Sequence, residues 1–275
     1  MSKQQFSFVL TLLLFLGILN AGNELRVIQL LKDGVNSVDK LQNPTGVAIT
    51  PNGKYLYVAA YGDDAVAIFS RNSSTGKLAY TSNISINNPR LIRISPDSKH
   101  LYVNNYGQAK KIYIYSINDD SGALTSVDSL GNLYLCEDFQ LSSDGKNLYL
   151  AYKYGVQAYT RDSSTGKLSL LNTYSNINGD PVNLSISYND KFVLRSSTRG
   201  VVSFNRNTTT GVLTVADDDL ENGIVTNDLL DNIYTTTTDT SGKYIYTSSP
   251  TYGNLIIRKS SDGTISYTDR QSELD

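Results

Sequence analysis

The chain has 275 residues, a formal net charge of −2 and 18% charged residues. No strong positive field would attract it to nucleic acid or to an anionic membrane, so we expect neither as a partner. Its one cysteine, Cys136, excludes an internal disulfide. With no histidine near it in the sequence, this thiol is expected to be a small buried hydrophobe rather than a nucleophile.

Residues 1–22 have the pattern of a signal peptide. Lys3 is followed by an apolar run over residues 6–19 and then by the small residues Ala21 and Gly22. The run is short for a transmembrane helix and fits the apolar region of an export signal, although an uncleaved anchor is an alternative. We therefore expect a secreted or periplasmic protein whose residues 23–275 form a single domain without a membrane span.

Two landmarks recur along the rest of the chain at the same interval. Residues 51–58 (Pro-Asn-Gly-Lys-Tyr-Leu-Tyr-Val) recur at 96–103 and 143–150, with weaker copies at 188–194 and 240–246. The shared lysines are Lys54, Lys99, Lys146, Lys191 and Lys243. A Thr-Gly-Lys-Leu turn at residues 75–78 recurs in phase in each later copy. A fixed period of about 45 residues indicates a repeat architecture.

Each repeat is predicted to form four strands. In the first copy these cover residues 46–50, 55–60 and 65–70 and a stretch from Leu78 onward, separated by Gly-containing turns. Four antiparallel strands in each unit of this length are typical of a β-propeller blade. The fold class is therefore all-β, with five blades counted. The repeat lysines are expected to be exposed charges at turn edges.

The repeat resembles that of the lactonase-type propeller family, which carries a Ser-Pro-Asp-Gly-Lys-x-Leu-Tyr-Val core and a Thr-Gly-x-Leu turn. The resemblance covers roughly residues 26–268 and is strongest at 51–58 and 96–103. It implies a propeller related to 6-phosphogluconolactonase-like enzymes and to exported propellers without an established reaction. Members of this family have seven blades, so an incomplete or open arrangement is the alternative to a ring of five.

The ring of five is the preferred prediction, with its two ends adjacent in the last blade. Residues 26–31 align with the fourth-strand position, yet residues 264–268 occupy that position too. This gives 21 candidate strands where five blades need 20, so one candidate is surplus or forms an extra edge strand.

The face on which propellers usually bind ligands is formed by the loops between second and third strands and between blades. Here these loops repeat a Tyr-Gly pair, and the candidate ligand-binding residues are Tyr61, Tyr106, Tyr154, Tyr252 and, in the fourth copy, Arg199. Either the tyrosines pack between blades, or they line a mouth for a glycan, small molecule or protein.

Arg90 and Glu137 are the candidate catalytic pair, because lactone opening needs a base for water and a donor for the oxyanion. The only histidine, His100, is placed in the tight turn between the first and second strands, on the face opposite the usual ligand entrance, and is interpreted as a variant of the repeat. Together with Asp138 and Asp180 in nearby loops, Arg90 and Glu137 are the charged residues expected near the entrance of the central channel.

No motif for a cofactor or a metal is present, and the acidic run 217–219 is interpreted as a solvated loop. Sequons occur at Asn72, Asn83, Asn183 and Asn207. The leading functional hypothesis is a non-catalytic binding scaffold for a glycan or protein. The alternatives are a lactonase-like hydrolase acting on a sugar lactone and a purely structural envelope protein.

Overall fold

A computed structural model describes residues 27–218, except 107–109, 132, 134–135 and 178, and residues 235–269, except 242, 250–253 and 261–264. The described strands form five separate four-stranded antiparallel sheets, each built from consecutive strands. This confirms the predicted all-β propeller of four-stranded blades. The predicted signal peptide (residues 1–22) lies outside the described residues.

Every blade runs from an inner strand to an outer one. The inner strands are β1 (Pro44–Ile49), β5 (Pro89–Ile94), β9 (Asp138–Leu141), β13 (Pro181–Ile186) and β17 (Thr235–Thr238). The second strands are β2 (Tyr55–Ala60), β6 (His100–Asn105), β10 (Asn147–Tyr152), β14 (Phe192–Ser197) and β18 (Tyr244–Ser249). The third strands are β3 (Ala65–Arg71), β7 (Ile112–Ile117), β11 (Gly155–Arg161), β15 (Gly200–Arg206) and β19 (Asn254–Ser260). The outer strands are β4 (Leu78–Ser85), β8 (Leu124–Leu130), β12 (Leu168–Tyr174), β16 (Leu213–Asp218) and β20 (Ile265–Asp269).

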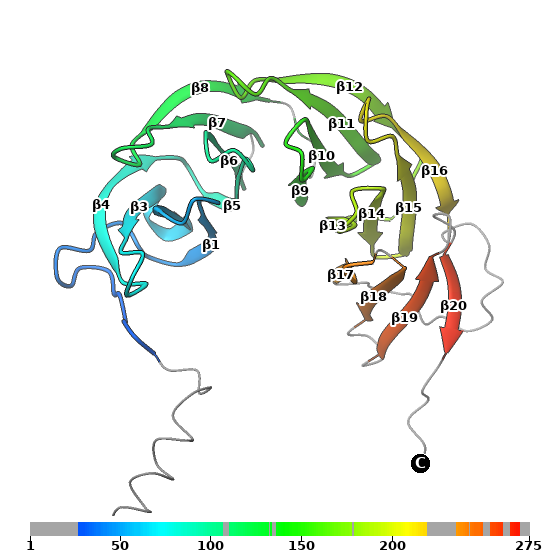
Figure 1. Cartoon of the computed structure of the whole chain (residues 1–275), viewed down its shortest axis with the longest axis horizontal. Coiled ribbons are helices and arrows are strands. Elements are labelled where there is room, and N and C mark those ends of the chain that lie inside the picture. Colours follow the sequence, from blue (N-terminus) through cyan, green and yellow to red (C-terminus); the bar gives the residue numbers. More distant parts are fainter. Residues whose placement is uncertain are drawn as a thin grey trace, which may run out of the picture.

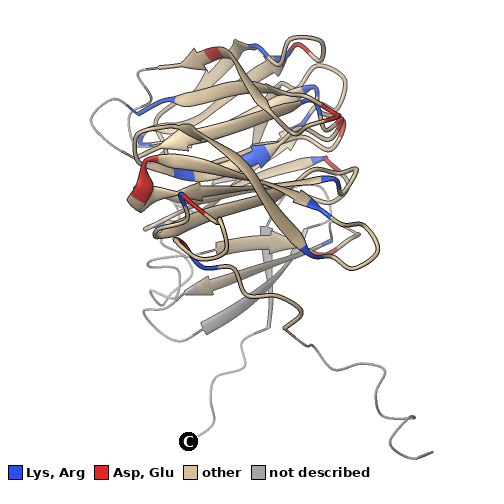
Figure 2. Cartoon of the chain, turned by 90° about the vertical axis from the view of Figure 1, so that its left-hand side faces the viewer, with Lys and Arg blue, Asp and Glu red and all other residues tan. Residues whose placement is uncertain are grey.

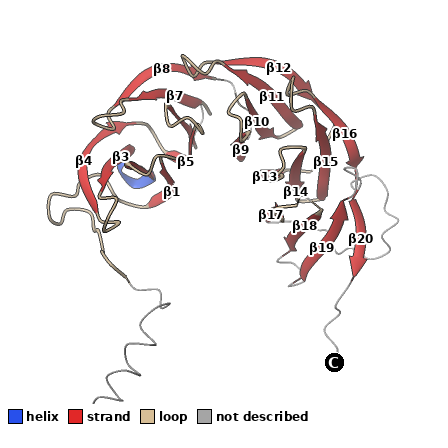
Figure 3. Ribbon diagram, viewed as in Figure 1, coloured by secondary structure: helices blue, strands red, loops and turns tan. Residues whose placement is uncertain are grey.

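The five blades follow one another along an open arc, with the inner strands on its concave side (Figure 1). Each inner strand contacts the inner strand of the next blade, from β1 through β5, β9 and β13 to β17. A single turn of 3-10 helix, η1 (Tyr61–Asp63), interrupts this all-strand arrangement in the described residues (Figure 3).

The predicted closed ring of five is wrong, and the open alternative is correct. Residues 27–31 form no strand, and the fifth sheet is complete with β17–β20. The side-chain amide of Gln29 instead bonds both the N–H and the carbonyl of Leu78, at 2.8 and 2.9 Å. This segment therefore lies against the first blade, far from the fifth (Figure 1). Each repeat therefore supplies all four strands of its own described sheet.

The N-terminal segment covers part of the free face of the first blade. Val38 is 5% exposed and packs with Leu31 and Leu41 against Val58 and Phe69. A terminal repeat has a neighbour on one side only, so its other face needs a cover of this kind.

A tyrosine in the second strand of three blades bonds the hairpin glycine of the next blade. The hydroxyls of Tyr57, Tyr102 and Tyr149 donate to the carbonyl oxygens of Gly122, Gly166 and Gly211, each at 2.8 Å. These three tyrosines are completely buried. We call these contacts the tyrosine latches. They join the two repeat landmarks across every junction from the first to the fourth blade. The fourth blade has Leu194 at the tyrosine position.

Two buried arginines at the ends of third strands reinforce two of these latches. Arg161 donates from Nε to the Tyr102 hydroxyl at 2.8 Å and pairs with Asp97 at 2.9 Å. In the next blade, Arg206 donates from Nε to the Tyr149 hydroxyl at 2.8 Å and pairs with Asp144 at 3.4 Å. Their charges are thus matched by carboxylates of the preceding blade, as buried charges require.

A chain of polar contacts also joins the inner strands. Asp138 accepts from Arg93 at 3.0 Å and from the Asn183 amide at 2.9 Å, and Asn183 in turn accepts the Thr236 N–H at 3.2 Å. Burial raises the pKa of Asp138, and the Arg93 charge opposes that shift. The Asn183 side chain is therefore committed to an inter-blade contact, which makes this sequon a poor glycan acceptor.

The remaining repeat features have structural roles. The five repeat lysines are exposed, as predicted, and Lys54 pairs with Asp119 of the next blade at 2.7 Å. Charged residues of both signs are interspersed on the face of the chain shown in Figure 2.

Candidate functional site

A cavity of about 320 Å³ lies where the first three blades meet. Residues from all three of these blades line it: Asn43, Thr45, Tyr61, Arg90, Tyr106 and Glu137. Four of them were predicted from the sequence, namely Tyr61, Tyr106, Arg90 and Glu137. They come from η1, the loop after β6, the strand β5 and the segment before β9. The volume is within the range of small-molecule sites.

Close packing of the first two blades fixes the floor of this cavity. The Thr45 hydroxyl is within 3.0 Å of the Pro89 carbonyl oxygen and 3.1 Å of that of Arg90. Gly46 allows this approach, because a Cβ atom there would lie 2.5 Å from the Arg90 carbonyl oxygen. A larger residue at position 46 would push β1 and β5 apart, so the glycine is needed for the cavity to form.

The charged end of the cavity is a cluster of two cations around one carboxylate. Arg90 Nη1 bonds Glu137 Oε2, and Lys110 Nζ lies 3.7 Å from Oε1. The side chains of Arg90, Glu137 and Lys110 are 38%, 20% and 15% exposed. The cluster carries a net charge of +1, which favours a ligand or transition state with negative charge. Lys110 was not predicted, because no repeat motif marks the loop before β7.

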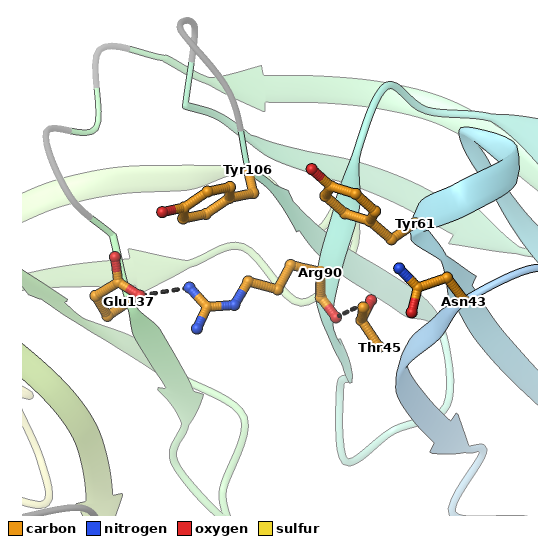
Figure 4. Close-up of a pocket in the computed structure, with 6 residues that line it drawn as sticks. All are labelled: Asn43, Thr45, Tyr61, Arg90, Tyr106 and Glu137. Carbon is orange, nitrogen blue, oxygen red and sulfur yellow. Dashed lines mark hydrogen bonds and ion pairs between the residues drawn. The ribbon is translucent and has the colours of Figure 1, made fainter.

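The aromatic wall of the cavity is formed by two tyrosines. Their rings lie on the same side of the Arg90 side chain, and Glu137 lies at its far end (Figure 4). The Tyr106 ring centroid is 5.3 Å from Arg90 Cζ and 4.8 Å from Lys110 Nζ. Both cations therefore also hold this ring in place. The tyrosines combine a flat apolar surface with a hydroxyl, which suits the faces and edges of a sugar.

The other predicted ligand residues do not join this cavity. Tyr154 is 55% exposed, and its ring contacts that of Tyr152 edge-on with 6.0 Å between centroids. Arg199 is exposed in the loop between β14 and β15. Tyr252 lies outside the described residues. The tyrosine-lined mouth is therefore restricted, in the described part of the chain, to the first two blades.

His100 and Cys136 have structural environments. His100 is the first residue of β6 and is 2% exposed, with Nδ1 2.8 Å from Arg161 Nη2. Burial lowers the pKa of His100, and the Arg161 charge adds to that shift. Cys136 is 2% exposed, and burial raises its pKa to about 12. Neither group is placed to act in the cavity.

Within the described residues, no group of three or more histidine, cysteine, aspartate or glutamate side chains could hold a metal ion. Asp217 and Asp218 end β16, and Asp219 lies outside the described residues. No described helix is long and apolar enough to span a membrane.

The fold and its inter-blade contacts define the protein as a β-propeller. Residues 15–133 match the family described as Lactonase, 7-bladed beta-propeller. This match covers less than half of the chain, and it confirms the resemblance drawn from the repeat. No functionally curated protein matches the sequence.

Solved structures share this fold at low sequence identity. A candidate 6-phosphogluconolactonase from Bacteroides uniformis is 22% identical over 64% of this chain and 54% of its own, with a TM-score of 0.56. The match thus spans about half the length of that protein. A second one, from Bacteroides fragilis, is 18% identical over 82% and 83% of the two chains, with a TM-score of 0.56. A Lactobacillus plantarum protein is 17% identical over 82% and 70%, with a TM-score of 0.66.

Proposed function

We propose that this protein is a lactonase-like hydrolase that opens a sugar lactone in the cavity between its first three blades. The observation that carries the proposal is the convergence of Arg90, Glu137, Tyr61 and Tyr106 on one cavity. The match to a lactonase family supports this function better than the non-catalytic scaffold that the sequence alone favoured.

Glu137 is assigned as the general base. Hydrolysis begins when water attacks the lactone carbonyl carbon and loses a proton to a nearby carboxylate. Oε2 is bonded to Arg90, whereas the partner of Oε1 among the described residues is the more distant Lys110, at 3.7 Å. Oε1 is therefore the oxygen with room to accept the proton from water. The protonated acid then returns this proton to the ring oxygen as the carbon–oxygen bond breaks, and a hydroxy acid results.

Arg90 and Lys110 are assigned to the oxyanion. The tetrahedral intermediate places a negative charge on the former carbonyl oxygen, and cations in a partly buried site stabilise such charge strongly. Both side chains are well under half exposed. Their pairing with Glu137 holds them in place before the substrate arrives, so little reorganisation is needed in the reaction.

Tyr61 and Tyr106 are assigned to substrate positioning. A lactone ring held against their rings would keep its carbonyl carbon near Glu137, at the charged end of the cavity (Figure 4). Such positioning raises the rate by fixing the reacting groups in place.

One observation favours a second candidate, a binding site for a glycan or protein without catalysis. Both cations already contact Glu137, so the carboxylate is held in ion pairs before any ligand arrives.

Assays with a panel of lactones distinguish the hydrolase from the non-catalytic binding site. Purified protein would be incubated with aldonolactones of different ring size and substitution, with spontaneous hydrolysis subtracted, and the hydroxy acid measured. Turnover of at least one lactone is expected. Saturable binding of the same sugars without turnover would favour the binding site and contradict the hydrolase.

A further inference from the structure

The fourth blade carries an arginine inside its second strand at a position that is apolar in the first three blades. Register and repeat place Arg195 of β14 in line with Val58, Val103 and Leu150. The propeller fold therefore does not require a charge at this position.

Arg195 is completely buried, and two of its three nitrogen atoms lack a hydrogen-bond acceptor. Nη2 donates to the Gly179 carbonyl oxygen at 2.7 Å, whereas Nε and Nη1 have no partner. No carboxylate of the described residues lies within ion-pair distance of it. The buried Arg161 and Arg206, by contrast, each pair with an aspartate.

The cross-strand neighbours of Arg195 are apolar. They are Leu184 and Val202, which belong to the core between the third and fourth blades. Burial lowers the pKa of Arg195 to about 10, although the more distant charge of Asp180 opposes this shift, so the guanidinium is still charged at neutral pH. A buried charge with unsatisfied donors is costly unless a counter-charge is present.

We infer that Arg195 is the cation of an interior site for a small monovalent anion, of the size of a halide or a formate, at the junction of the third and fourth blades. The free Nε–H and Nη1–H groups would bind it, and its charge would replace the missing carboxylate.

The loop beside Arg195 limits the size of the ion. A Cβ atom at Gly179 would lie 2.7 Å from Ser197 Oγ and 3.2 Å from Arg199 Cβ, so these loops are closely packed. The site is separate from the cavity of the first three blades and does not depend on the proposed hydrolase activity.

Thermal unfolding in matched salts tests the inference. The full chain would be melted at constant ionic strength in sodium chloride, sodium formate or sodium isethionate, whose anion is larger. At ten times Kd, chloride or formate should raise Tm by about 3–6 °C over isethionate. Arg195→Val, which copies the first blade, should abolish this difference, whereas Arg199→Ala should retain it. Equal Tm values in all three salts for the wild-type chain would overturn the inference.

A bromide soak of wild-type crystals gives an independent test that does not depend on the folding of a variant. An anomalous peak within hydrogen-bond distance of Arg195 Nε or Nη1 is expected. Water alone at both nitrogen atoms in bromide would overturn the inference.

Discussion

The hydroxyl of Tyr57 in the first blade donates a hydrogen bond of 2.8 Å to the carbonyl oxygen of Gly122 in the hairpin of the second. Tyr57 belongs to the Lys-x-Leu-Tyr-Val landmark and Gly122 to the Gly-x-Leu landmark. The two recurrent motifs are therefore complementary halves of one inter-blade contact. This explains why they keep the same phase along the chain.

Removing one latch should weaken the junction it serves. Tyr57→Phe leaves a buried carbonyl without its donor, and we expect a loss of about 1–2 kcal/mol in the free energy of unfolding. Tyr102→Phe should cost more, because Tyr102 also accepts from Arg161 Nε. Urea unfolding measures both. Tyr188→Phe, at a side chain 73% exposed, is the control and should have no effect. Equal urea midpoints for Tyr57→Phe and the control would contradict a stabilising role for this hydrogen bond.

The hairpin glycine Gly122 and the turn glycine Gly34 of the N-terminal segment offer a matched pair of substitutions. Gly122 and Gly34 have φ of +70° and +71°. A Cβ atom at Gly122 would lie 2.4 Å from the Tyr55 ring, whereas one at Gly34 would meet nothing within 4 Å. Gly34→Ala should therefore cost only the backbone strain, about 1–2 kcal/mol. Gly122→Ala should cost about 1–3 kcal/mol more. Thermal unfolding measures both losses of stability. Similar losses for the two variants would show that the hairpin is not closely packed against the neighbouring blade.

The ion pair between the second and third blades should give a pH-dependent stability. Burial alone would raise the pKa of Asp97, but hydrogen bonds from Ser95 and Arg161 outweigh it and hold the pKa below its usual value of 3.8. A carboxyl whose pKa is lowered by folding stabilises the protein above its unfolded pKa, and this stability is lost as the pH falls through the folded value.

Asp97→Asn should thus cost about 1.5–3 kcal/mol at pH 7, and the difference from wild type should shrink below about pH 4. Urea unfolding at a series of pH values provides the comparison. A difference that stays constant down to pH 2 would mean that Asp97 does not stabilise the junction through its charge.

The predicted signal peptide can be tested through its cleavage from the mature protein. If residues 1–22 are a signal peptide, protein recovered from the producing cell should begin near residues 21–23. Intact-mass analysis checks this directly. A cytosolic species that retains residue 1 would refute the proposed export.

Much of the fold could be predicted from the repeat. The second strand, expected at residues 55–60, is observed as Tyr55–Ala60, because alternating side chains and a Pro-Asn-Gly turn define it locally. Blade closure could not be predicted in this way. Residues 26–31 have the composition of a strand, but the pairing of Gln29 with Leu78 is a tertiary contact that no local pattern reveals.

The candidate site was only partly predictable. Tyr61 and Tyr106 were found because they recur, and Arg90 and Glu137 because they are rare charges in inter-blade segments. Lys110 lies outside any shared motif, and Arg195 replaces an apolar residue of the repeat, so what marks them is burial and the identity of their neighbours. Tyr154 follows the same repeat as Tyr106 but does not line the cavity, and its ring contacts Tyr152 and Lys153 instead.

The central claim is that Glu137 acts as a base in lactone hydrolysis, and its most direct test is the initial rate of acid release with the best substrate. We predict that Glu137→Gln lowers kcat by about 10²–10⁴-fold while the protein remains folded. Asp180→Asn, at an exposed carboxylate that does not line the cavity, is the control and should retain the wild-type rate. A Glu137→Gln protein as active as wild type, or a wild-type protein that hydrolyses no lactone, would contradict the claim.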